Sequence, residues 1–491
     1  MAVNTPNGLS ERHIIEDVVL QGDTWGSILA SVQVDTIGKE IEDSGLGYKY
    51  KDVLPVSLLG LVDDLIGVTQ AGYQAQELNA VLNVKTAEKR LQFGPSKCNS
   101  MLISKSTESF INSPLQVDDW KVKYEENPET GETELIETYE GMVEIEKTQK
   151  QKYLGFMISN IGDNMVNIKA MKQKSNGIIK KIFDRLEKLK LKYYYFECAL
   201  IFLNVMLRSS ILYACECYYN LKEKEVRNLE RIEEHFLRKL FGTTRGCPIS
   251  QLYLEAGHTP IRYEAKKMRL LFLQYILNEK PESLIYKFLQ LQFKNPTRGD
   301  WGSACLDDLK HLGINLSLQE IKSMSKIKFN KIIMLSIQKC ALEYLLRKQG
   351  SKGKDILYSE IKMPEYLMPN EFNLTIEQKR YIFSMRNKMV PIENNFPSKG
   401  IVEKCVCGEN LEMLHIYQCS CLNKENEVIT YNKIYSENIN EVRQVYQRFK
   451  KNIEKRNEII FETDMEKDET TPQEIPKRDP LPSVPEFSYG K

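Results

Sequence analysis

KDVLPVSLLGLVDDLIGVT, residues 51–69, is the most informative segment for predicting the fold. It contains two apolar runs rich in β-forming residues, which are separated by the acidic pair Asp63 and Asp64. Two such runs joined by a short polar step are typical of a β-hairpin with a tight turn. We therefore predict a hairpin with both aspartates in its turn. Adjacent carboxylates at a hairpin tip suit Mg²⁺, and a solvated pair of turn residues is the alternative interpretation.

After this hairpin the sequence predicts a helix and further strands. Residues 71–93 carry leucines and a valine at helical spacing until Gly94-Pro95 ends the pattern. A short strand is expected at 99–104, an exposed hairpin around the turn-rich 126–132, and one more strand at 152–159. The stretch up to about residue 162 therefore predicts a small antiparallel sheet accompanied by helices.

Beyond Asp163 the pattern becomes mainly helical until about residue 390. The most apolar segment, 196–207, is interrupted by Glu197 and Asn204, so it falls short of the roughly 20 apolar residues that a membrane span needs. We predict a buried helix there and no membrane partner. The Pro-containing, charged end of the chain predicts disorder.

The composition narrows the class of protein. The chain has 68 Lys and Arg against 67 Asp and Glu, so only local charge can indicate nucleic-acid binding. Its 11 cysteines lack regular spacing and its start is polar, which argues against a secreted, disulfide-bonded protein. We expect a reducing, intracellular location.

Positive charge is concentrated in residues 166–193, which hold nine Lys or Arg and two acidic residues. A helical face of this kind attracts a nucleic-acid backbone without reading its sequence. The alternative is a solvated face of an amphipathic helix. The candidate phosphate-binding residues are Lys172, Lys174, Lys180, Lys181 and Arg185.

A group of soft metal ligands lies near the end of the chain, where CVCGENLEMLHIYQC contains Cys405, Cys407, His415 and Cys419. Three thiols and an imidazole suit tetrahedral Zn²⁺. The single residue between the first two cysteines is shorter than usual, so Cys421 is an alternative ligand. Reduced cysteines around a loop are the alternative to a zinc-knuckle-like module.

Four segments in one chain order resemble the reverse transcriptases of non-LTR retrotransposons. QGDTWGSILASVQVDTIGKE at 21–40 resembles their Gln-Gly motif, and LGLVDDLIGVT at 59–69 resembles their catalytic Asp-Asp hairpin. NVKTAEKRLQFGPSKCNSML at 83–102 is similar to the helix and lysine-bearing loop that follow, and KYLGFMIS at 152–159 is similar to the primer-grip strand. The likeness continues through a basic thumb to the Cys/His cluster.

This resemblance implies a nucleotidyltransferase site that uses Mg²⁺. It makes Asp63 a metal ligand with Asp64 beside it, and Lys97 a proton donor to pyrophosphate, for which a solvated loop lysine is the alternative. Gln21 and Gly22 would border the template and the nucleotide, and Gly22 could equally serve a turn. The primer grip would be Tyr153, Leu154 and Gly155. The implied partners are an RNA template and a DNA primer, and the implied location is nuclear.

One departure from the family limits the expected activity. The family places another metal-binding aspartate and the fingers well before the Gln-Gly motif, whereas only 20 residues precede Gln21 and Asp17 is too close to be that ligand. Two-metal catalysis needs carboxylates from separate strands. We therefore expect an RNA-directed DNA polymerase fragment that is inactive unaided, or helped by a chain that supplies the fingers. The alternatives are a non-catalytic nucleic-acid-binding protein and an inert remnant.

The predicted fold class is α+β, with a partial palm carrying a small antiparallel sheet followed by mainly helical regions. The predicted domains are a partial palm at 1–162, a basic helical thumb at 163–260, a helical domain at 261–400, the Cys/His module at 401–425 and a disordered tail at 426–491.

Overall fold

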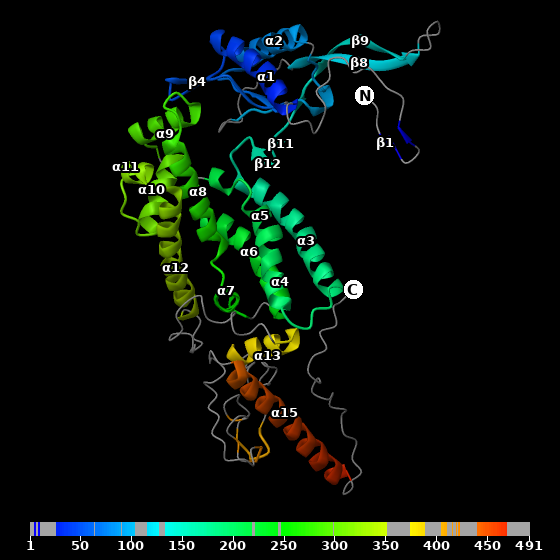
Figure 1. Ribbon diagram of the computed structural model, residues 1–491, viewed down its shortest axis with the longest axis vertical. Helices are drawn as coiled ribbons and strands as arrows, with labels where there is room; N and C mark the ends of the chain where they lie inside the picture. The colour runs from blue at the N-terminus through cyan, green and yellow to red at the C-terminus, as the bar shows by residue number, and fades with distance from the viewer. Residues whose placement is uncertain are drawn as a thin grey trace. The chain divides into compact units, whose positions relative to one another are not determined.

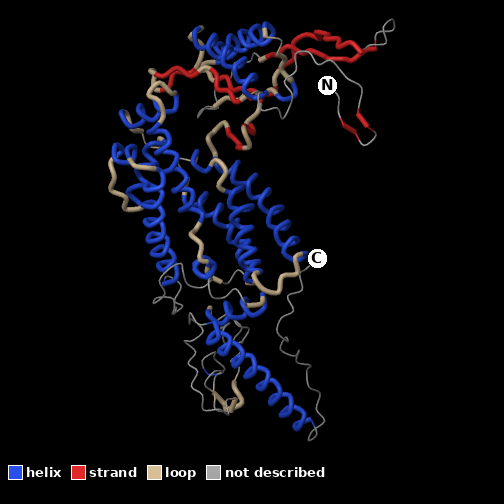
Figure 2. The backbone as a smooth tube through the Cα atoms, viewed as in Figure 1, coloured by secondary structure: helices blue, strands red, loops and turns tan. Residues whose placement is uncertain are grey.

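The computed structural model describes most of the chain and divides it into two compact units. The described residues are 4–5, 8–9, 26–62, 64–89, 91–103, 115–126, 133–218, 221–243, 247–297, 299–350, 374–387, 404–409, 415, 419, 421–422 and 439–468. The first unit is Met1–Ala170 with Lys280–Pro296, and the second is Met171–Glu279 with Thr297–Lys491. The fold is mixed α and β and mostly helical, and the described strands, red in Figure 2, belong to the first unit.

The predicted hairpin is confirmed and belongs to the first unit. Strands β5 (Leu58–Leu61) and β6 (Asp64–Gly67) are antiparallel, and Leu61 pairs with Asp64. Asp64 is therefore the first residue of β6, which corrects its predicted place in the turn. The tight turn instead takes its positive φ from Val62, at 58°. A second hairpin, β3 (Tyr48–Tyr50) and β4 (Leu54–Val56), precedes it.

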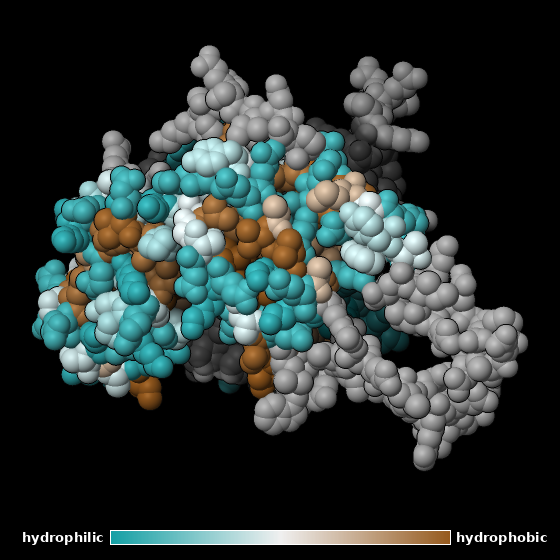
Figure 3. All heavy atoms as spheres, turned by 90° about the horizontal axis from the view of Figure 1, so that it is seen from above, coloured by the Kyte–Doolittle hydropathy of each residue, from teal (hydrophilic) through white to brown (hydrophobic). Residues whose placement is uncertain are grey.

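Two helices, α1 (Gly26–Asp43) and α2 (Gly72–Glu88), pack beside the β5–β6 hairpin (Figure 1). Their shared core consists of Ile37, Ile41, Leu78 and Leu82, and Leu58 of β5 packs against it. Helix α2 ends before Gly94-Pro95, because the chain turns back and the Leu91 amide donates to the Thr86 carbonyl. Apolar side chains also reach the surface of the molecule, where Figure 3 shows brown residues among teal ones.

The rest of the first unit contains small sheets and one helix. Strands β8 (Gln116–Glu126) and β9 (Thr133–Glu144) confirm the predicted exposed hairpin, whereas the predicted strand at 99–104 is reduced to β7 (Asn99–Ser100), parallel to β10 (Glu146–Lys147). Two short strands, β1 (Asn4–Thr5) and β2 (Gly8–Leu9), pair in antiparallel fashion near the start of the chain. Helix α9 (Leu284–Lys294) joins this unit.

The predicted single strand at 152–159 is wrong, because the segment folds back on itself. Strands β11 (Lys150–Tyr153) and β12 (Phe156–Ser159) pair with Tyr153 opposite Phe156. The turn residues Leu154 and Gly155 have φ of 46° and 83°. Positive φ at both central positions is typical of a type I′ turn, one of the two common turns of two-residue hairpins.

Among its described residues, the second unit contains helices and no strands. Its helices are α3 (Asn164–Lys188, which begins in the first unit), α4 (Tyr195–Phe202), α5 (Ser209–Ile211), α6 (Glu223–Phe241), α7 (Ile249–Ala256), α8 (Ile261–Asn278), α10 (Trp301–His311), α11 (Leu318–Ser323), α12 (Lys326–Gly350), α13 (Ile376–Arg386) and α15 (Ile439–Asp468). A π-helical segment, η2 (Leu203–Arg208), joins α4 to α5, and a 3-10 turn, η3 (Cys215–Cys217), follows. None of the described helices is apolar over enough length to span a bilayer.

Buried ion pairs lie within the core of this unit. Arg208 donates to Glu233 at 2.5 Å, and the Tyr253 hydroxyl donates to the same carboxylate at 2.6 Å. Arg386 of α13 donates to Glu255 of α7 at 2.5 Å, and both side chains are fully buried. Because an unpaired buried charge is costly, these contacts fix the register of the helices that carry them.

Helix α15 corrects the prediction of a disordered tail at 426–491. Val442, Val445 and Phe449 follow one another at spacings of three and four residues, so they form an apolar stripe along one side of the helix. The stripe is buried in a small core shared with α13. The proline-rich residues 469–491 lie outside the described residues.

Candidate metal centre and nucleic-acid interface

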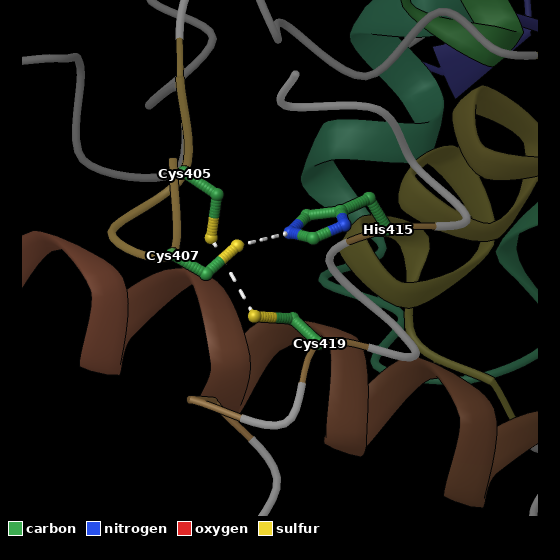
Figure 4. Close-up of side chains that lie close together, drawn as sticks. All are labelled: Cys405, Cys407, His415 and Cys419. Carbon is green, nitrogen blue, oxygen red and sulfur yellow. Dashed lines mark hydrogen bonds between the residues drawn. The ribbon is translucent and has the colours of Figure 1, made fainter. Parts of the chain in front are cut away.

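The four predicted zinc ligands converge in space. The ligand atoms of Cys405, Cys407, His415 and Cys419 all lie within 4.8 Å of one another (Figure 4). The Cys405 and Cys419 sulfurs are 3.6 Å apart, and the Cys407 sulfur lies 3.1 Å from His415 Nε2. Tetrahedral Zn²⁺ with bonds of about 2.3 Å to sulfur places two thiolates about 3.8 Å apart. The donor set and its spacing therefore fit a zinc ion.

A tight turn allows Cys405 and Cys407 to bind the same metal ion although a single residue separates them. The Gly408 amide donates to the Cys405 carbonyl at 2.8 Å, and the Cys405 amide donates to the Glu409 carbonyl at 2.8 Å. Gly408 has a φ of +93°, which favours glycine at this position. The turn buries Cys405 and exposes Cys407, yet both sulfurs point to the same centre.

The second half of the cluster consists of His415 and Cys419, which a backbone hydrogen bond joins. The Cys419 amide donates to the His415 carbonyl at 2.7 Å, which places the two ligands on one side of the chain. Cys421 is exposed and does not belong to the group of converging ligands among the described residues. The alternative in which Cys421 replaces a ligand is therefore not the arrangement seen.

The pKa values of the two buried thiols shift in opposite directions. Burial raises the pKa of Cys405. Burial also acts on Cys419, but hydrogen bonds from the Leu422 and Cys421 amides outweigh it and lower the pKa of that thiol. Since zinc binds thiolates, metal binding at this cluster releases protons.

The module rests on α15, which sequence reasoning missed. Cys405 and Cys419 belong to the same buried cluster as Val445 and Phe449. Lys455 of α15 donates to the carbonyls of Cys421 and Leu422 at 3.2 and 3.1 Å. The signal that could have found this helix is the apolar spacing within 442–449.

The predicted catalytic residues are only partly within the described structure. Asp63, Gln21 and Gly22 lie outside the described residues. Asp64 is exposed at the start of β6, and Lys97 is exposed in the 3-10 turn η1 (Pro95–Lys97). Both belong to the first unit, but among the described residues no hydrogen bond or ion pair joins Lys97 to Asp64.

The predicted primer-grip residues lie in the β11–β12 hairpin of the first unit. Burial raises the pKa of Tyr153, and the negative charge of Asp64 adds to this effect. Leu154 and Gly155 form the adjoining turn.

Glycines allow the helices to approach the β5–β6 hairpin closely. A Cβ at Gly60 would lie 2.9 Å from Leu65 Cδ2 and 3.2 Å from Val34 Cγ1. A Cβ at Gly67 would lie 2.9 Å from Leu78 Cδ2. These contacts are closer than ordinary van der Waals packing, so a larger residue at either position would displace the neighbouring side chains.

The basic residues of α3 lie on its solvent-facing side. The buried side carries Ile179, Ile182 and Phe183, whereas the predicted phosphate-binding residues are all exposed: Lys172, Lys174, Lys180, Lys181 and Arg185. Lys174, Lys181 and Arg185 follow at spacings of seven and four residues, so they form one stripe along the helix. This exposure suits a phosphate backbone, and it suits a solvated face equally well.

Comparison with protein-family models and with curated proteins finds no match for this sequence.

Proposed function

We propose that the chain is the rear part of a non-LTR retrotransposon reverse transcriptase, which grips a primer-template through α3 and folds its Cys/His module around zinc. The observation that carries the proposal is the β5–β6 hairpin, which presents Asp64 exposed directly after its turn. The resemblance assigns this hairpin to the metal-binding part of the catalytic site. The cluster of Cys405, Cys407, His415 and Cys419 near the end of the chain supports the same proposal, because the resemblance expects a Cys/His cluster there.

Polymerisation by this site needs one more carboxylate. Asp63 and Asp64 come from one hairpin, whereas two Mg²⁺ ions about 4 Å apart need ligands from separate strands. The bound metal would stabilise charge on the transferred phosphoryl group. The chain's own residues would position the primer terminus against it, and the chain alone would bind the primer-template without extending it.

Primer extension tests the proposal. The purified chain is incubated with an RNA template, a DNA primer, nucleotides and Mg²⁺, beside Asp63→Ala and the control Asp43→Ala on α1. We expect no extension by any of them. Extension that Asp63→Ala abolishes and Asp43→Ala preserves would show that the chain supplies the further carboxylate itself, and that its predicted inactivity is wrong.

Binding to the same primer-template tests the grip. If α3 engages about five phosphates, affinity should fall several hundred-fold, on the order of 500-fold, between 50 and 200 mM salt. Substituting Lys174, Lys181 and Arg185 with Gln should weaken binding and reduce the salt dependence. Absence of binding, or affinity independent of salt, would contradict the proposal.

A second candidate function is non-catalytic nucleic-acid binding. It is favoured by the exposed stripe of Lys174, Lys181 and Arg185 on α3. This stripe can bind phosphates whether or not the β5–β6 hairpin is catalytic. Under this alternative, the chain would bind single-stranded RNA as well as it binds the primer-template. Preference for the primer-template would favour the first proposal.

A further inference from the structure

The β8–β9 hairpin carries a strong negative charge. Residues 116–144 contain ten Asp or Glu and two Lys, a net charge of −8. Like charges repel, so this hairpin is excluded from contact with a phosphate backbone. It therefore takes no part in the nucleic-acid grip proposed above, and its surface calls for another explanation.

Among the described residues, no further strand pairs with either outer edge of this hairpin. Strands β8 and β9 form a two-stranded sheet in the part of the chain that the structure describes. The base of β8 is held by α2, where the amides of Asn79 and Asn83 donate to the Gln116 carbonyl. An unpaired edge presents a row of N–H and C=O groups that another extended chain can bind.

Large apolar side chains are exposed beside this edge. Trp120 and Tyr139 pack against each other across the strands with ring centroids 5.0 Å apart. Tyr139 and Met142 of β9 lie on the face of the hairpin that carries Trp120, and they remain 49% and 52% exposed. Val143, which is 40% exposed, follows Met142 directly and lies on the opposite face. Exposed aromatic and apolar side chains beside an unpaired strand edge are typical of a binding surface.

Carboxylates lie next to these exposed aromatic and apolar side chains. The Tyr139 hydroxyl donates to Asp118 at 3.3 Å, and Lys121 pairs with Glu140 across the strands. Asp119 stands beside Trp120 at a bulge in the ladder. A ligand of this surface therefore meets backbone groups, aromatic rings and negative charge together.

We propose that the β8–β9 hairpin is a docking surface for an extended, Lys/Arg-rich segment of another protein, which adds as a strand along β9. Basic side chains fit both features of the surface, since their aliphatic stems cover aromatic rings while their charged ends pair with carboxylates. A second copy of the hairpin does not fit, because two strongly acidic hairpins repel each other.

Binding of a short fluorescent peptide of alternating Lys and Val to the full chain tests this proposal by fluorescence anisotropy. The variant with Asp118→Asn, Asp119→Asn and Glu140→Gln should bind at least about tenfold more weakly. The matched control neutralises three acids elsewhere in the first unit, with Glu42→Gln, Asp43→Asn and Asp52→Asn, and should bind like the unmodified chain. Equal affinity of both variants would overturn the proposal.

A second peptide separates strand addition from simple attraction. N-methylation of alternate residues keeps the peptide's charge but removes backbone donors, so it should bind about tenfold more weakly. Equal binding of the two peptides would overturn strand addition. Binding of the primer-template by the Asp118, Asp119 and Glu140 variant should be unchanged, so that failure here is distinguishable from failure of the proposed function.

Discussion

At the scale of single residues, Gly47 occupies a position that both its backbone conformation and its neighbours restrict to glycine. Its φ is +137°, and a Cβ there would lie 2.5 Å from Ser57 Oγ and 2.8 Å from the Val56 carbonyl oxygen. Because backbone atoms form part of this contact, a side-chain rotation cannot relieve it. The close approach places β4 against the end of the loop that follows α1.

Gly47→Ala should therefore lower the free energy of unfolding by about 2–4 kcal/mol, through backbone strain and overpacking. Chemical denaturation followed by circular dichroism measures the effect. Gly177→Ala is the control, since Gly177 lies within α3 with open space around its Cα, and this change should stabilise by about 0.5–1 kcal/mol. Equal effects of the two substitutions would contradict the contact at Gly47.

His258 makes stability depend on pH. Burial, and next the charge of Arg208, lower the pKa of its imidazole below the ordinary 6.5. Below that pH the unfolded chain binds a proton that the folded chain does not, so stability should fall as the pH drops from about 7 to 5. His258→Gln should make this decline shallower in urea denaturation at several pH values. An unchanged slope would mean that other groups cause it.

At the scale of elements, α15 and the Cys/His module form one folding unit. The module contributes Cys405 and Cys419 to a core that otherwise consists of α13 and α15 side chains, together with Leu374 and Leu422. Such a small core buries little apolar area, and small modules of this kind gain much of their stability from a metal. The order of α15 should thus depend on zinc.

Replacing Cys405 and Cys419 together with Ser should reduce bound zinc from about one equivalent to near zero by elemental analysis. The same variant should lose helical signal and become sensitive to proteolysis within α15. Cys421→Ser, which removes an exposed thiol outside the cluster, should keep both zinc and helix. Unchanged zinc in the double variant would rule out the assignment of these ligands.

At the scale of the whole molecule, the sequence predicted those features that local pattern determines. The β5–β6 and β8–β9 hairpins were predictable because alternating or apolar runs surround obvious turn residues. The β11–β12 turn was not, since Leu154 adopts a positive φ that a leucine rarely takes. The convergence of the zinc ligands followed from their spacing, whereas the pairing of Asn99 with Glu146 depends on tertiary packing that no local pattern encodes.

Long-range charge pairing was equally invisible in the sequence, and it gives the last prediction. Arg386 and Glu255 stand 131 residues apart and pair with both side chains fully buried. Arg380 of the same helix donates to the Leu240 and Lys239 carbonyls at the end of α6. Charged groups therefore join helix α13 to α6 and α7. Because α13 also packs against α15 and the Cys/His module, these contacts attach the module to the other helices of the second unit.

Removing one residue takes the opposite charge of a fully buried ion pair away from the other, so Arg386→Met should cost about 3–5 kcal/mol of unfolding free energy. Glu255→Met should cost a similar amount. The double variant should cost less than the sum, because it buries no lone charge and two apolar side chains fill the space. A double-mutant cycle by chemical denaturation measures this coupling. Strict additivity would show that the pair does not hold α13 in place, and that its apolar contacts do so alone.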